Sequence, residues 1–246
     1  MLLIFGAALA GGCGVEGDAR GEPPRASDGL LLEVEQRVGG PLPPQPAPPS
    51  LTLALYADGR VFRPDPVPAI YPGPALPTFS LSRISPERVE DLLAEVRAAG
   101  VLDPQPDETV PDGGVTVVTA VVDGEARTVR LPNGSDAALR LERALRGLPA
   151  FGQRRYEPQA LAVFASRVKD VVVPDHEFEP EPTTFPWPAG ELVPGCSIVR
   201  GSELERVLAH ARRANQLTRW QSGGALHAVA FRPLLPGESS CADVAP

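Results

Sequence analysis

The stretch LTLALYADGRVFR, residues 51–63, decides the fold class of this chain. Residues 51–56 are mostly apolar, Val61-Phe62 is a second apolar pair, and Asp58-Gly59 lies between them. Asp-Gly between two apolar runs is a strong signal of a tight hairpin turn, because glycine readily adopts the positive φ that such turns require. We therefore predict that residues 51–56 and 60–63 are antiparallel neighbours in a sheet.

Further strands and hairpins are predicted on both sides of this stretch. Residues 30–38 alternate, with Leu32 and Val34 on one face and Glu33 and Glu35 on the other, which is typical of a half-buried strand. A second hairpin is expected around Asp123-Gly124-Glu125 and a third around Gly223-Gly224. The remaining strands are expected at 79–84, 115–122, 126–131, 160–168, 196–199, 217–221 and 225–231.

Three amphipathic helices are predicted between these strands. The first begins at Ser85-Pro86-Glu87, which combines an N-cap serine, a proline at the first helical position and an acid in the first turn. Ser135 begins a second helix, which runs to about residue 148. Ser202 with Glu205 forms a capping box for a third helix, which runs to about residue 215. An α+β fold follows, with the helices packed on an antiparallel sheet.

Composition sets the domain organisation. The chain has 246 residues, enough for one large domain or two small ones, and 30 of them are proline, more than twice the usual share of about 5%. The prolines cluster at 39–49, 64–77 and 175–194, so we expect long Pro-rich loops there. A break at 149–158 divides the globular region 29–246 into subdomains 29–150 and 151–246. The net charge of −8 argues against nucleic acid as a partner.

The N-terminal segment predicts export. Residues 2–10 are an apolar run of the length of a secretory signal, too short to span a bilayer, which takes about 20 residues. Leu9-Ala10-Gly11-Gly12-Cys13 resembles the box that precedes the acylated cysteine of bacterial lipoproteins. We expect lipid on Cys13, a signal segment at 1–13, a flexible tether at 14–28 and anchoring to the outer face of the cell membrane. The alternative is an ordinary secretion signal.

The other two cysteines, Cys196 and Cys241, form an even pair once Cys13 carries lipid. Export favours their oxidation to a disulfide. Closing a loop of about 46 residues would stabilise the fold by roughly 4 kcal/mol in the chain-entropy model. The alternative is two unpaired thiols.

No catalytic, metal or cofactor site is assigned. Ser222 and His227 lack the strand–serine–helix order of a hydrolase elbow, and His227 shares a strand face with Val229 and Phe231, as a packed histidine would. The acidic segment Asp175-His176-Glu177 is more typical of a solvated loop than of a calcium site. Aromatic side chains in the Pro-rich loops either form a binding surface or attach the loops to the core. They are Tyr71, Phe178, Phe185 and Trp187.

Three motifs carry a resemblance. They are Val-Gly-Gly at 38–40, Leu-Tyr-Ala-Asp-Gly-Arg-Val at 55–61 and Leu-Ser-Arg-Ile-Ser-Pro-Glu-Arg-Val at 81–89. With the segment before Cys13 and the almost complete use of arginine in place of lysine, they resemble uncharacterised exported lipoproteins of actinobacteria. The resemblance implies location and general shape.

We expect a non-enzymatic envelope protein that binds a protein, a peptide or a cell-wall component. The alternatives are a module similar to secreted protease inhibitors or immunity proteins, and a hydrolase whose site is assembled from distant residues.

Overall fold

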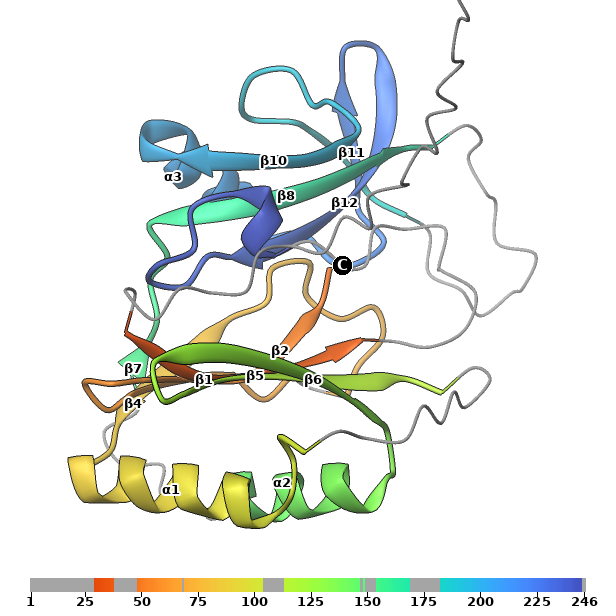
Figure 1. Ribbon diagram of the computed structural model, residues 1–246. Helices are drawn as coiled ribbons and strands as arrows, with labels where there is room; N and C mark the ends of the chain where they lie inside the picture. Colours follow the sequence, from red (N-terminus) through yellow and green to blue (C-terminus); the bar gives the residue numbers. More distant parts are fainter. Residues whose placement is uncertain are drawn as a thin grey trace, which may run out of the picture.

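The strands of the computed structural model form two sheets, shown in Figure 1. The structure describes residues 29–37, 48–67, 69–103, 113–146, 148, 154–168 and 182–244. The first sheet has the order β6-β5-β1-β2-β3-β4-β7, with β1 (Leu30–Arg37), β2 (Ser50–Tyr56), β3 (Arg60–Pro64), β4 (Phe79–Arg83), β5 (Val115–Val122), β6 (Glu125–Pro132) and β7 (Arg154–Arg155). The second has the order β10-β8-β12-β11-β9, with β8 (Ala160–Arg167), β9 (Thr184–Pro186), β10 (Gly195–Arg200), β11 (Arg219–Ser222) and β12 (Ala225–Pro233).

Helices α1 (Pro86–Ala98) and α2 (Asp136–Arg146) lie side by side along one face of the first sheet (Figure 1). The alternation of β1 directs Leu32 and Val34 into this core, where Val34 is flanked by Leu53 of β2 and Val118 of β5. Complete burial of one such aliphatic side chain contributes about 1.5–3 kcal/mol. This apolar layer therefore joins β1, β2 and β5 to both helices.

Helix α3 (Gly201–Ala211) covers the outer face of the second sheet. Its Val207 packs in one core with Leu161 of β8 and Phe231 of β12. Trp220 of β11 is completely buried there, as an aromatic residue at the start of a core hairpin is expected to be.

The C-terminal segment after β12 lies between the two sheets, where it is drawn in dark blue in Figure 1. Leu235 packs with Phe62 on the face of the first sheet opposite α1 and α2. Leu234 and Val244 pack instead with the inner face of β8. The molecule thus has four layers: α1 with α2, the first sheet, the second sheet, and α3.

The predicted α+β fold is confirmed, since antiparallel sheets carry three packed helices. Every strand pair within these sheets is antiparallel except β9 with β11. The two Asp-Gly hairpins and the Gly-Gly hairpin form where they were expected. Among the described residues, no helix is long and apolar enough to cross a membrane.

Several details of the sequence interpretation were wrong. Helix α3 begins at Gly201, directly after β10, so Ser202 lies inside the helix and Arg200 occupies the N-cap position without a side-chain capping bond, and the helix ends at Ala211 instead of about residue 215. Strand β7 lies in the expected break at 149–158, and β9 lies in the expected loop at 175–194. The last strand was expected to end at residue 231, but β12 continues to Pro233 because residues 161–163 of β8 pair with it. Arg232 is therefore a strand residue on the inner face of the second sheet.

Candidate functional site

The connection between β3 and β4, residues 65–78, presents an apolar tip to solvent. Val67, Ile70 and Tyr71 are 59%, 67% and 67% exposed. Only five large apolar side chains in the described part of the chain are exposed, and three of them lie within these five consecutive positions. We call residues 65–78 the β3–β4 loop. Clustered exposed apolar residues mark interaction surfaces, whereas single ones are ordinary.

Hydrogen bonds hold the β3–β4 loop at both ends. At its base, Asp65 N donates to Thr78 O at 2.8 Å. Farther along, Gln216 N donates to Gly73 O at 2.9 Å, and Ala75 N donates to Ala214 O at 3.1 Å. The loop thus leaves the first sheet and is attached to the segment that follows α3. Both halves of the chain therefore hold the residues on either side of the tip, because the base of the loop belongs to the first sheet and residues 73–75 bond to residues 214–216.

A buried side chain adds to this attachment. Leu76 is 6% exposed and belongs to the core beneath α3, together with Leu208. Transferring an aliphatic side chain of this size out of water contributes about 1.5–3 kcal/mol. The sequence pattern of the first half does not predict this contact, because the partner residues lie more than a hundred positions away.

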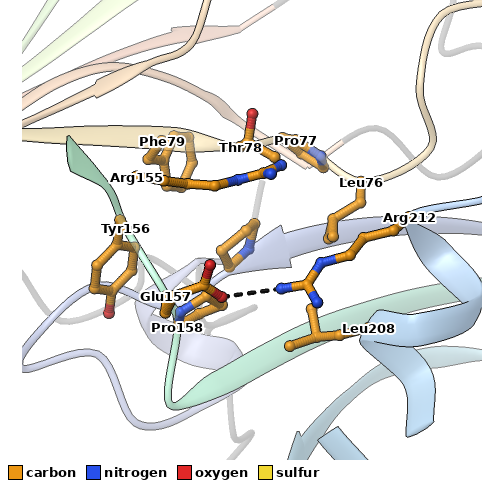
Figure 2. Close-up of a pocket in the computed structure, with 11 residues that line it drawn as sticks. Leu76, Pro77, Thr78, Phe79, Arg155, Tyr156, Glu157, Pro158, Leu208 and Arg212 are labelled. Atoms are coloured by element: carbon orange, nitrogen blue, oxygen red, sulfur yellow. Dashed lines mark hydrogen bonds and ion pairs between the residues drawn. The ribbon is translucent and has the colours of Figure 1, made fainter. Parts of the chain in front are cut away.

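The second part of the loop lines a shallow groove of about 280 Å³, with its solvent-open space included (Figure 2). Arg155 of β7 extends along one side toward Thr78, and Arg212 reaches across to Glu157 from the end of α3. The Nη2 of Arg212 lies 2.9 Å from Oε2 of Glu157, and both side chains are about half exposed. The other lining residues are Leu76, Pro77, Phe79, Tyr156, Pro158, Leu208 and Pro233.

A charged cluster is buried between the sheets, next to Pro233 of the groove. Arg232 places Nη2 at 2.9 Å from Glu238 Oε1, 3.7 Å from Glu35 Oε1 and 3.8 Å from Glu33 Oε1. The guanidinium side chain is 3% exposed, and the three carboxylate side chains are 12–14% exposed. We call these four residues the interface cluster. It joins β1 of the first sheet to β12 and the following turn.

Burial changes the acidity of the carboxyl groups in the interface cluster. Burial first, and then the neighbouring Glu35 and Glu238 carboxylates, raise the pKa of Glu33 to about 8 despite the nearby guanidinium. The pKa values of Glu35 and Glu238 are also raised by burial, against the opposing effect of Arg232. One guanidinium does not compensate three carboxylates, so this site favours retention of a proton.

Two tyrosines border the interface cluster. Tyr56 donates its hydroxyl proton to Pro236 O at 2.7 Å, and Tyr156 donates to Leu234 O at 2.8 Å. Burial is the main cause that raises the pKa of Tyr156 to about 12, and it also raises the pKa of Tyr56. Both side chains remain neutral donors and hold the turn after β12 against the first sheet.

The aromatic residues selected from the sequence lie in different environments. Tyr71 is exposed at the tip of the β3–β4 loop, whereas Phe185 and Trp187 are half-buried. Their rings pack edge-to-face on Trp220, with centroids 5.9 and 5.5 Å away. Phe178 lies outside the described residues. A shared binding surface for these four aromatic residues stays a prediction.

Ser222 is half-buried and His227 is buried, and both have structural surroundings. Ser222 Oγ accepts a hydrogen bond from Leu192 N at 2.9 Å, and His227 is 3% exposed on the face that carries Val229 and Phe231. Within the described ranges, no group of three His, Cys, Asp or Glu side chains is arranged to hold a metal ion. The acidic segment at 175–177 lies outside those ranges.

The predicted disulfide is confirmed. Cys196 of β10 bonds to Cys241, with an S–S distance of 2.09 Å and a Cα–Cα distance of 6.0 Å. It attaches the segment after β12 to the edge of the second sheet. Cys13, the expected site of lipid attachment, lies outside the described residues.

The sequence interpretation missed the interface cluster. It placed Glu33 and Glu35 on the strand face opposite Leu32 and Val34, which is correct, but a half-buried strand normally turns that face to solvent. Here the second half of the chain covers it. Two features of the sequence could have indicated the cluster. One is the pair Glu33 and Glu35 on one face of a strand. The other is the set of strands in the second half of the chain, which also needed a surface to cover one of their faces.

The structure thus defines an α+β protein with two sheets and an exposed apolar loop that is hydrogen-bonded on both sides of its tip, next to a shallow groove. No protein-family model, no curated protein and no solved structure matches this chain.

Proposed function

We propose that this chain is a non-enzymatic binding protein of the cell envelope that recognises another protein through the tip of the β3–β4 loop. The observation that carries the proposal is the clustering of Val67, Ile70 and Tyr71 on a loop that is attached at both ends. A loop that is already hydrogen-bonded on both sides of its tip loses less entropy on binding than a free segment, so its apolar contacts contribute more fully to affinity.

The partner offers an apolar surface, because the exposed side chains of the tip are aliphatic and aromatic. Tyrosine is enriched at the centres of protein interfaces, where its ring is buried and its hydroxyl meets a polar group. The groove beside the loop extends the contact area with Arg155 and Arg212 on its sides. Acylation of Cys13 would keep this surface close to partners at the outer face of the cell membrane.

Site-specific photo-crosslinking tests the proposal. A photo-reactive residue at position 70 is compared with one at position 139, because Leu139 is an exposed apolar residue on α2, on the opposite side of the first sheet. We expect a discrete adduct from position 70 in the native envelope and none from position 139. Excess wild-type chain should abolish it, whereas the double variant Ile70→Ser, Tyr71→Ser should not. Equal adducts from both positions, or none, would overturn the proposal.

The membrane anchor is tested separately by intact mass. We expect the exported chain to begin at Cys13 and to carry acyl mass. A mature chain that begins elsewhere, or begins there without acyl mass, contradicts the anchor and leaves the loop proposal to its own test.

The same loop supports a second candidate, an inhibitor-like module that inserts the tip into the active site of a secreted protease. An exposed loop that is attached on both sides of its tip is the feature that such modules need. The candidate predicts that the chain inhibits a protease that prefers apolar residues, that Ile70→Ser abolishes inhibition, and that Leu139→Ser does not. Cleavage at the tip at the rate of an unstructured peptide would exclude it.

A further inference from the structure

The interface cluster holds more acidic groups than its one cation can compensate. Glu33 and Glu35 project from β1, Glu238 projects from the turn after β12, and Arg232 projects from β12 itself. With every group ionised, three carboxylates surround one guanidinium in a largely buried site. Like charges brought together out of water repel strongly, and one of them is expected to take up a proton.

The turn that carries Glu238 depends directly on this cluster. Leu235 N donates to Glu238 Oε2, and Glu238 N donates to Leu235 O at 3.1 Å. Leu235 of the same turn packs in the core of the first sheet. The backbone carbonyls of Pro236 and Leu234 accept hydrogen bonds from the hydroxyl groups of Tyr56 and Tyr156. It is therefore the main contact of the C-terminal segment with the first sheet.

We propose that the interface cluster is a proton-dependent contact between the two sheets. One proton held among Glu33, Glu35 and Glu238 keeps the turn at 234–238 packed on the first sheet, and its loss loosens that turn. Glu33 holds the proton because it has only the 3.8 Å contact with Arg232. Glu238 makes the 2.9 Å contact with the guanidinium, and Glu35, at 3.7 Å from it, is also close enough to Arg37 to be influenced by that second cation.

Among the residues that the structure describes, no second cation lies within contact distance of Glu33. On β1, Arg37 acts on Glu35. On the neighbouring elements, Arg60 stacks over the Tyr56 ring at 4.7 Å, and the Asp243 carboxylate adds negative charge. Tyr56 and Tyr156 are neutral. Their hydroxyl groups donate hydrogen bonds to backbone carbonyls and therefore not to the Glu33 carboxyl group.

The direction of the pH effect follows from the raised pKa of Glu33. The unfolded chain releases this proton near the ordinary value of 4.5, whereas the folded chain retains it to about pH 8. The free energy that favours the packed turn is therefore largest below pH 4.5. It falls as the pH rises from 4.5 to 8 and is constant above that range.

The disulfide confines this change to a short segment. Residue 233 ends β12, and Cys241 is bonded to β10, so only the residues between them can move when the turn loosens. Pro233 and Tyr156 line the groove and border this turn, so its loosening changes one wall of the groove. The inference does not depend on the proposed partner.

Hydrogen exchange of the full chain, followed by mass spectrometry at pH 6 and pH 9, tests the inference. After correction for the intrinsic exchange rate, we expect the protection factor of the peptide that covers 234–240 to fall about tenfold or more between the two pH values. Peptides from α1 and β8 should keep their protection, which shows that the fold is intact.

A matched pair of variants assigns the effect. Glu33→Gln imitates the protonated carboxyl, so the 234–240 peptide should keep similar protection at both pH values. Glu90→Gln lies on the exposed face of α1 and should keep the wild-type pH dependence. Three results would overturn the proposal: unchanged wild-type protection, an equal loss in every peptide at pH 9, or wild-type pH dependence in folded Glu33→Gln.

Discussion

Arg232 shows how one residue can connect two halves of a chain. It is 2% exposed, it contacts three carboxylates, and its guanidinium lies 5.6 Å from the centre of the Phe79 ring. Buried charges of this kind contribute little net stability as a group, because desolvation opposes their attraction. Removing one partner is costly nonetheless, because the remaining charges stay buried.

Arg232→Met is expected to lower the free energy of unfolding by about 3–5 kcal/mol at pH 7, because the buried carboxylates that are still ionised at this pH lose their cation. The loss should be smaller at pH 5, where protonation of those carboxyl groups removes the uncompensated charge. Urea denaturation at the two pH values measures both quantities.

Arg206→Met is the matched control for Arg232→Met. Its contact with Glu203 is 3.9 Å long and about half exposed, and its Nε donates to Pro188 O at 3.1 Å at an exposed site, so we expect a loss below about 1 kcal/mol that is the same at both pH values. An equal loss for the two variants, or a loss for Arg232→Met that grows at low pH, would contradict this account of the interface cluster.

The two Asp-Gly hairpin turns need glycine for different reasons. Gly59 and Gly124 each follow an aspartate in a predicted hairpin turn, and both have positive φ, at 80° and 83°. Their surroundings differ. A Cβ on Gly59 would lie 2.3 Å from the carbonyl oxygen of Ile84, whereas a Cβ on Gly124 would have no neighbour within 4 Å.

Gly124→Ala is therefore expected to cost about 1–2 kcal/mol, the cost of left-handed backbone for a residue with a Cβ. Gly59→Ala should cost about 1–3 kcal/mol more, because the backbone at Ile84 must also move. Denaturant unfolding of the two variants measures the difference. Equal costs would show that the contact with Ile84 relaxes freely.

Helix starts allow a similar comparison. Ser85 Oγ accepts a hydrogen bond from Arg88 N at 3.3 Å at the N-terminus of α1, as its sequence predicted. Ser202 lies exposed inside the first turn of α3, without a capping role, because β10 leads straight into that helix at Gly201.

We expect Ser85→Ala to cost about 1 kcal/mol, because the substitution leaves a backbone N–H of the first turn without its acceptor. Ser202→Ala should change stability by less than about 0.5 kcal/mol. Thermal unfolding monitored by circular dichroism distinguishes them, and a larger cost for Ser202→Ala would contradict the observed start of α3.

At the scale of the whole molecule, three features hold the two sheets together. The β3–β4 loop is attached to the segment after α3, the turn after β12 packs on the first sheet, and the disulfide restrains that segment from its other end. Each half therefore supplies a segment that the other half buries.

The double variant Cys196→Ser, Cys241→Ser is expected to lower the free energy of unfolding by about 4 kcal/mol, because unfolding would then release a loop that the disulfide keeps closed. Urea denaturation with and without a reductant measures this. The reductant should weaken the wild-type protein and leave the double variant unchanged. A loss below about 1 kcal/mol would contradict the chain-entropy account.

Local patterns in the sequence determined the hairpins, α1 and α2. Turn chemistry, helix caps and apolar periodicity act over a few residues, so they can be read without the fold. The Cys196–Cys241 pairing was inferred from the cysteine count, because the expected lipid attachment at Cys13 leaves two cysteines to pair.

Only the tertiary structure decided which strand faces meet. Glu33 and Arg232 are separated by about two hundred positions, and no local pattern states that the acidic face of β1 is covered by β12 and the turn after it. The same holds for Leu76. It lies on the β3–β4 loop, which starts from the first sheet, but its side chain is buried in the core of the second sheet. Packing of the two halves against each other places these side chains, because each sheet must cover a face that its own helices leave open.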